Sequence, residues 1–195
     1  MSPSKVNFKM YQGSTFSEVL RWESSRKVYK KITGISNAAP CIITSTAHGV
    51  PNGWKVKVTN VVGMTDINSV DEYKEATVSD LDEIELNSIN SVDYKTYVSG
   101  GILEYNEPID LTGFTARMQL REKIDSVDTI DEYNTEDGTI VIDTVNSTIT
   151  IVVSAVDTAA YTFSSVVYSL ELTSSGGIVT PLANGTITLV KEVTK

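Results

Sequence analysis

Hydrophobic and polar positions alternate most strictly in the segment 114–121. Every second side chain there is apolar, and the positions between hold threonine, arginine or glutamine; the apolar residues are Phe114, Ala116, Met118 and Leu120. A period of two is typical of a strand with one face in a core and the other in water. Pro108, Asp110 and Gly113 come before it and predict a turn. The turn is predicted to deliver the chain into a central antiparallel strand.

Weaker alternation predicts strands on both sides of this segment. In the stretch 16–22, Glu18 lies on the apolar face. We interpret it as a strand end near a sheet edge, and the alternative is an inward charge held by Arg117 or Arg121. Further strands are predicted at 140–143, 148–153, 166–173, 178–182 and 186–190. Asn184 and Gly185 predict a turn between the last two, which makes the C-terminus a three-stranded meander.

A single short helix is predicted. Ser154 is followed three residues later by Asp157, a spacing that resembles a capping box and predicts a helix from Ala155 to Tyr161. The segment 122–138 is predicted to be an acidic loop, and the polar stretch 23–31 has no assigned element.

The pattern of turn-forming residues changes between Thr33 and Glu104. Proline, glycine and asparagine recur at short intervals and separate strand candidates at 41–44, 55–59, 75–78, 84–86 and 101–104. No window of about 11 residues carries a helical stripe. The segment holds ten acidic and four basic residues, a stronger acidic excess than the rest of the chain has. It is predicted to be a separate compact β module.

Charge and hydropathy restrict the partners. The net charge of -9 opposes nucleic-acid phosphate and anionic lipid, so we expect no nucleic-acid partner. No apolar run approaches the ~20 residues of a membrane span, and the first ten residues lack the features of a signal peptide. We therefore expect no membrane insertion and synthesis in the cytosol. Cys41, the only cysteine, is predicted to be a small buried hydrophobe.

Residues for catalysis are sparse. A nucleophilic triad would depend on His48, the only histidine, yet no GxSxG motif occurs, so His48 is assigned to a turn. The acidic runs 80–85 and 125–137 lack the spacing of a calcium loop and are interpreted as solvated turns. We predict no catalytic, cofactor-binding or metal-binding residues, and no cofactor. Trp54 is assigned to a core, whereas Tyr94, Tyr97 and Tyr105 remain open between core packing and contact with a glycan or partner.

Several segments together resemble a module of tailed-bacteriophage and prophage structural proteins. They are residues 11–16, 108–119, 149–160, 168–172 and 185–188. Members of that family look like immunoglobulin-like antiparallel β-sandwiches that serve as virion building blocks, often near the tail, its fibres or the baseplate. The resemblance implies an all-β sandwich made of residues 1–32 and 105–195, with one short helix.

The segment 33–104 looks like a different module. Its turns at Pro40, Gly49, Gly53 and Gly63 resemble those of the small β-barrel-like module named after the first catalytic-cysteine half-domain of ubiquitin-activating enzymes. Copies of that module occur in phage proteins without ubiquitin chemistry. The resemblance implies that residues 33–104 are inserted into an early hairpin loop of the sandwich. Ile32 and Leu103 are then expected to be neighbours in space.

Together these features predict a non-enzymatic bacteriophage virion structural protein, made in the host bacterial cytoplasm. The expected address is the tail, as a collar, fibre-attachment or baseplate component, with several copies in a symmetric ring contacting other virion proteins. Arg117, Gln119 and Arg121, on the wet face of the central strand, are candidate contacts for an acidic neighbour or are only solubilising. The alternatives are a capsid decoration or head-fibre protein, and a glycan-binding receptor module that binds host polysaccharide.

Overall fold

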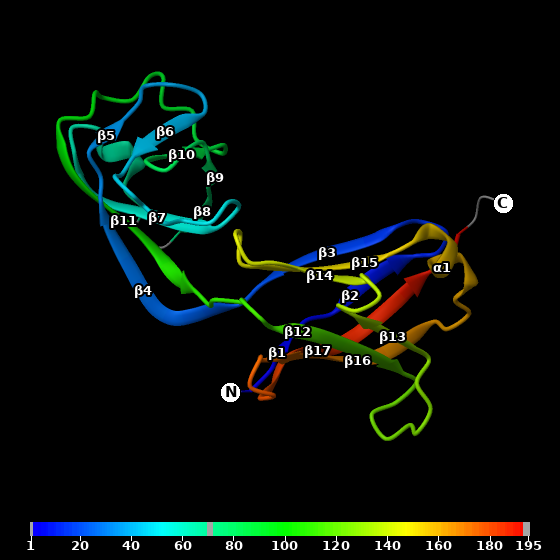
Figure 1. Cartoon of the computed structure of the whole chain (residues 1–195). Coiled ribbons are helices and arrows are strands. Elements are labelled where there is room, and N and C mark those ends of the chain that lie inside the picture. The colour runs from blue at the N-terminus through cyan, green and yellow to red at the C-terminus, as the bar shows by residue number, and fades with distance from the viewer. Residues whose placement is uncertain (1, 70–71, 193–195) are drawn as a thin grey trace. The chain divides into compact units, whose positions relative to one another are not determined.

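The structure is a computed structural model of the 195-residue chain and describes residues 2–69 and 72–192. The fold is all-β apart from one short α-helix and one 3-10 turn, as expected. The chain divides into two compact units (Figure 1). We call Met1–Trp22 with Asp110–Lys195 the sandwich unit, and Glu23–Ile109 the inserted unit. No helix in the described part of the chain is long and apolar enough to cross a membrane.

The sandwich unit is built from two sheets that lie in separate layers (Figure 1). The six-stranded sheet has the order β1-β17-β16-β12-β13, with β2 also paired to β17; its strands are β1 (Ser4–Lys5), β2 (Phe8–Tyr11), β12 (Thr115–Arg121), β13 (Asp131–Asn134), β16 (Ser165–Thr173) and β17 (Val179–Val190). The three-stranded sheet has the order β14-β15-β3; its strands are β3 (Phe16–Arg21), β14 (Ile140–Asp143) and β15 (Thr148–Val153). Phe8 and Phe16 make an edge-to-face contact between the layers, with centroids 5.8 Å apart.

Strand β12 confirms the prediction from alternation. Ala116, Met118 and Leu120 are buried, and β12 lies between β16 and β13. The turn before it is closed by the Phe114 N–H, which donates to the Leu111 carbonyl at 3.1 Å. The strict alternation of apolar and polar residues was enough to predict this strand, because both neighbouring strands also bury the face that carries its apolar residues.

The polar stretches that received no strand prediction contain two strands. In the sandwich unit, β13 lies within the predicted acidic loop and buries only Tyr133. In the inserted unit, β4 occupies Glu23–Lys31 and buries none of its residues fully. Edge strands of this kind are held by backbone pairing rather than by an apolar face, so their amino-acid composition predicts them only weakly.

The end of the chain corrects another prediction. Val179–Val190 is one strand of 12 residues, β17, rather than two strands joined by a turn, so the C-terminus is a two-stranded hairpin with β16. A Cβ at Gly185 would lie 1.8 Å from the Val6 carbonyl oxygen. Gly185 therefore marks a close approach of two backbones and not a turn.

Strands β1 and β2 pair with β17 in parallel, so the six-stranded sheet is mixed instead of purely antiparallel. No hairpin joins either strand to β17, since they come from the opposite end of the chain; antiparallel direction is therefore not imposed.

Glu18 lies half-buried on β3, at the edge of the three-stranded sheet. The prediction of a sheet edge is confirmed, whereas that of a strand end is wrong, because Glu18 pairs with Ile151 in the middle of β3.

The predicted helix is present as α1 (Ala155–Ala160). The Ser154 hydroxyl accepts from the Asp157 N–H at 3.1 Å and donates to the Asp157 carboxylate at 2.6 Å. The capping spacing therefore predicted the start of the helix, and the predicted end at Tyr161 lies one residue beyond the observed one.

The inserted unit contains two four-stranded sheets around one core. Their orders are β5-β6-β10-β9 and β4-β11-β7-β8; the strands are β4 (Glu23–Lys31), β5 (Gly34–Ile35), β6 (Cys41–Thr44), β7 (Lys55–Val62), β8 (Lys74–Glu75), β9 (Thr77–Val78), β10 (Glu83–Leu86) and β11 (Ser99–Pro108), with the 3-10 turn η1 (Thr65–Ile67). Trp54, Ile43 and Leu103 are fully buried in the core, and Cys41 lies there as predicted. The described residues form no closed barrel. The module predicted to be barrel-like is therefore built from two separate sheets.

The boundaries of the inserted unit lie outside the expected 33–104. Strands β4 and β11 pair from Lys31 opposite Ile102 to Glu23 opposite Pro108, so both belong to the inserted unit along their whole length. The Ile32 N–H donates to the Gly101 carbonyl at 3.0 Å. The two ends of the guest segment are therefore side by side, as the insertion into a loop requires.

Candidate functional site

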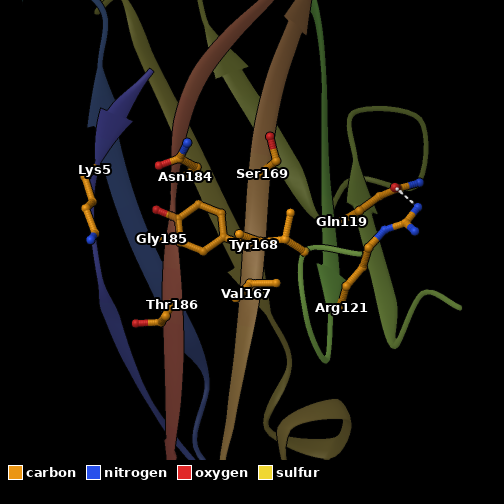
Figure 2. Close-up of a pocket in the computed structure, with 10 residues that line it drawn as sticks. Lys5, Gln119, Arg121, Val167, Tyr168, Ser169, Asn184, Gly185 and Thr186 are labelled. Carbon is orange, nitrogen blue, oxygen red and sulfur yellow. Dashed lines mark hydrogen bonds between the residues drawn. The ribbon is translucent and has the colours of Figure 1, made fainter. Parts of the chain in front are cut away.

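A groove of about 570 Å³ lies on the outer face of the six-stranded sheet (Figure 2). It crosses β1, β17, β16 and β12 and reaches the loop after β12; its lining residues are Lys5, Gln119, Arg121, Ile124, Val167, Tyr168, Ser169, Asn184, Gly185 and Thr186. Strand alternation creates it, because β16 buries Tyr168 and Leu170 and turns Val167 and Ser169 outward. We call it the sheet groove.

One side of the sheet groove carries a fixed cation. The Arg121 guanidinium donates to the Gln119 side-chain oxygen at 2.9 Å (Figure 2). It also donates to the carbonyls of Ser126 and Val127. Gln119 in turn donates to the Glu132 carboxylate at 2.6 Å. No carboxylate in the described part of the chain forms an ion pair with Arg121. Its charge is thus held in place by neutral acceptors and is available to an acidic group.

The other side carries Lys5, which lies across the groove from Arg121 (Figure 2). Lys5 is on β1, and β1 reaches this position because Gly185 lets Val6 approach β17 closely. Half-buried Val167, on β16, and exposed Ile124, in the loop after β12, add apolar surface to the groove. Such a groove suits an extended segment with both apolar and acidic side chains.

Arg117 lies apart from the sheet groove. It is four residues from Arg121 on the same strand, a spacing of about 13 Å, and its guanidinium is 3.9 Å from the Glu171 carboxylate. It lines a separate polar hollow with Glu132 and Glu136. The structure therefore brings Gln119 and Arg121 together, whereas Arg117 is already matched by acidic neighbours.

The candidate tyrosines of the inserted unit do not form an exposed platform. Tyr105 is 3% exposed and donates to the His48 carbonyl at 2.7 Å, so it belongs to the core and cannot contact a glycan. Tyr97 donates to the Gly100 carbonyl at 2.9 Å, and both Tyr97 and Tyr94 pack against the core while half-buried. Core packing is thus the interpretation that the structure supports for this group.

His48 has a structural role, as assigned. Its Nδ1 accepts from the Val50 N–H at 2.9 Å, and its Nε2 lies 3.1 Å from the Asp80 carbonyl, to which it donates in the tautomer that satisfies both bonds. Cys41 is buried, and this burial raises the pKa of its thiol, which disfavours the nucleophilic thiolate. Among residues 2–69 and 72–192, no group of three or more His, Cys, Asp or Glu side chains is placed to hold a metal ion.

The sandwich unit contains a network of tyrosine hydroxyl groups that the alternation of hydrophobic and polar residues did not predict. The Tyr133 and Tyr161 hydroxyls are 2.7 Å apart, and Tyr161 also donates to the Asp131 carboxylate. Burial raises the pKa of both tyrosines, and it raises that of Tyr168 on β16 as well. These hydroxyls therefore remain protonated in the folded state beyond the pH at which a free tyrosine ionises.

We expect the sandwich unit to lose stability at alkaline pH. The folded-state pKa values lie above the unfolded value of about 10, so the unfolded state releases these protons first. The free energy of unfolding should be at its full value below pH 10 and should fall as the pH rises above it. Urea unfolding at pH 8 to 11 measures this fall, which should be shallower for Tyr161→Phe. Tyr11→Phe, at an exposed tyrosine, should keep the wild-type slope.

No protein-family model matches the chain, and no curated protein gives a significant match to it.

Proposed function

We propose that the chain is a non-enzymatic structural protein of a tailed-bacteriophage virion, located at the tail. The observation that carries the proposal is that the segments resembling the phage module assemble into one sandwich unit. Residues 11–16, 108–119, 149–160, 168–172 and 185–188 contribute to strands β2, β3, β12, β15, β16 and β17 and to helix α1. All but the first two residues of the second segment lie in that unit, although an 87-residue guest interrupts the chain.

The proposed mechanism is assembly through the sheet groove. An acidic and apolar segment of a neighbouring virion protein would lie across β16, with its carboxylates between Lys5 and Arg121. A contact of this kind, repeated around a symmetry axis, places several copies in a ring. Collar, fibre-attachment and baseplate positions all fit this mechanism, and a capsid decoration or head-fibre position is the alternative address.

Reversing the charge of the groove should prevent incorporation. With Arg121→Glu in place of the wild-type chain, we expect the number of copies per purified particle to fall more than about tenfold, since breaking a charged interfacial contact costs about 2–5 kcal/mol. Quantitative mass spectrometry of the particles measures the copies. Arg121→Gln, which removes the charge and keeps donors for the loop carbonyls, should give an intermediate loss.

The matched control is Arg26→Glu, because Arg26 has a side chain that is 78% exposed and lies on the inserted unit. It should incorporate like the wild type. Thermal unfolding of each purified variant separates a folding defect from a docking defect. The assembly role is contradicted if the wild-type chain is absent from particles, or if folded Arg121→Glu incorporates normally.

A further inference from the structure

The inserted unit has a sheet face that is rich in lysine and carries an exposed aromatic ring. It is the outward side of β4, β11 and β7, which we call the lysine face; its residues are Lys27, Tyr29, Lys31, Lys55, Lys57, Thr59, Ile102 and Glu104. Half of the eight basic residues of this acidic unit lie here. Tyr29 is 62% exposed, the most exposed tyrosine among the described residues.

Strand register places the lysines around Tyr29. Glu104 is directly opposite Tyr29 on one side and Lys57 on the other, so these three residues form one row across the sheet. Lys31 lies in the next row, with Ile102 and Thr59. Residues two apart on a strand are about 7 Å apart, and residues two strands apart are about 10 Å apart. Tyr29 is therefore flanked by ammonium groups in two directions.

The charge of this face remains positive after its internal pairs are counted. Glu104 is compensated, because Lys27 lies 3.5 Å from its carboxylate and the Tyr73 hydroxyl donates to it. Glu75 on β8 is opposite Lys55 in the strand register and offsets part of that charge. Lys31 and Lys57 form no ion pair with any residue that the structure describes. They supply the uncompensated charge next to Tyr29.

We propose that the lysine face binds a polysaccharide that bears carboxylates at intervals along its chain. Tyr29 offers a flat ring on which a sugar ring stacks. Lys31, along the strand, and Lys57, across the sheet, offer cations to carboxylates near that sugar. Glu104, held by Lys27 and Tyr73, can accept from sugar hydroxyls. This proposal concerns a different unit from the assembly groove and stands without the assembly role.

The chemistry of the face favours this ligand over two others. Duplex nucleic acid carries a charge every ~1.7 Å, a density that two uncompensated lysines beside a carboxylate do not match. A protein partner would need an apolar centre, and lysine is depleted in protein interfaces. The apolar area on this face comes from Tyr29, Ile102 and the half-buried ring of Tyr73, whose centroid is 4.5 Å from the Lys27 Nζ, and these three residues form no continuous apolar centre. Sparse negative charge combined with hydroxyl groups matches the face best.

Affinity electrophoresis of the full chain in gels containing polygalacturonate, alginate or hyaluronate tests the proposal. We expect at least one of these polymers to retard the wild-type chain, more weakly as salt is added, and neutral dextran to have no effect. Tyr29→Ala and the double variant Lys31→Glu, Lys57→Glu should each weaken the retardation about tenfold or more, as expected for removing a contact at the centre of a site. Tyr29→Phe should retain most of it.

Matched controls lie on the sandwich unit. Tyr11 is 57% exposed, and Lys9 and Lys191 are exposed lysines, so Tyr11→Ala and the double variant Lys9→Glu, Lys191→Glu repeat the same chemical changes elsewhere. Both should migrate like the wild type in polymer gels relative to polymer-free gels. The proposal is overturned if none of the three polymers retards the chain, or if the controls lose as much retardation as the lysine-face variants. Equal, Tyr29-dependent retardation by oligothymidylate would overturn it in favour of nucleic acid.

Discussion

The Trp54→Ala variant is expected to unfold the inserted unit and to leave the sandwich unit folded. Trp54 is fully buried, and its Nε1–H donates to the Asn106 carbonyl at 3.0 Å. Its backbone carbonyl also accepts from the Ala76 N–H at 2.9 Å, beside the pairing of β7 with β8. Truncating a buried tryptophan costs about 3–5 kcal/mol. A domain of this size has a total stability of about 4–13 kcal/mol, so the loss removes much or all of it.

Hydrogen exchange read by mass spectrometry measures this result unit by unit. Peptides covering β7 and β11 should lose protection in Trp54→Ala, while peptides covering β12 and β16 should keep it. Trp54→Phe retains most of the ring and should lose far less protection. Simultaneous loss across both sets of peptides would show that the chain unfolds as one cooperative body, against the division into two units.

The Gly185→Ala variant is expected to detach the N-terminal strand from the sandwich. The added Cβ would lie 1.8 Å from the Val6 carbonyl oxygen, which is backbone and cannot move aside alone. Displacing Val6 breaks its N–H bond to the Asn184 carbonyl and removes the acceptor of the Tyr168 hydroxyl. Leaving that buried hydroxyl without a partner alone costs about 1–3 kcal/mol.

The same displacement would remove Lys5 from the sheet groove, so Gly185→Ala should also reduce incorporation into particles. Gly176→Ala is the matched control, because a Cβ there meets only the Ser174 hydroxyl at 3.8 Å. Urea unfolding and the exchange of residues 2–7 compare the two variants. Equal stability and equal protection in both would mean that the N-terminal strand is not packed on β17 in this way.

The sequence predicted those elements in which one face of a strand or a local cap decides the structure. The alternating run in β12 and the Ser154 cap of α1 are of this kind, and both are confirmed. Strands β4 and β13 were not predicted because backbone pairing forms them, with the distant β11 and with the preceding β12, and their own residues remain largely accessible. Gly185 was assigned to a turn because the closeness of Val6 depends on two segments about 180 residues apart.

The residues of the candidate sites likewise divide into those that a local sequence pattern predicts and those that only strand pairing brings together. Alternation identified Gln119 and Arg121, since a strand residue that faces away from a core is evident from sequence. Lys5, the opposite wall of the sheet groove, depends on the parallel pairing of β1 with β17, which no local pattern encodes. Tyr29 was missed for a related reason: it becomes part of a surface only when β4 pairs with β11 and β11 with β7.

An electron-microscopy map of the intact particle tests the assembly role most directly. We predict several symmetry-related copies of the chain at the tail, each contacting a neighbouring protein through the sheet groove between Lys5 and Arg121. Particles without density for the chain, or copies whose sheet groove faces solvent while another surface makes every contact, would contradict the account.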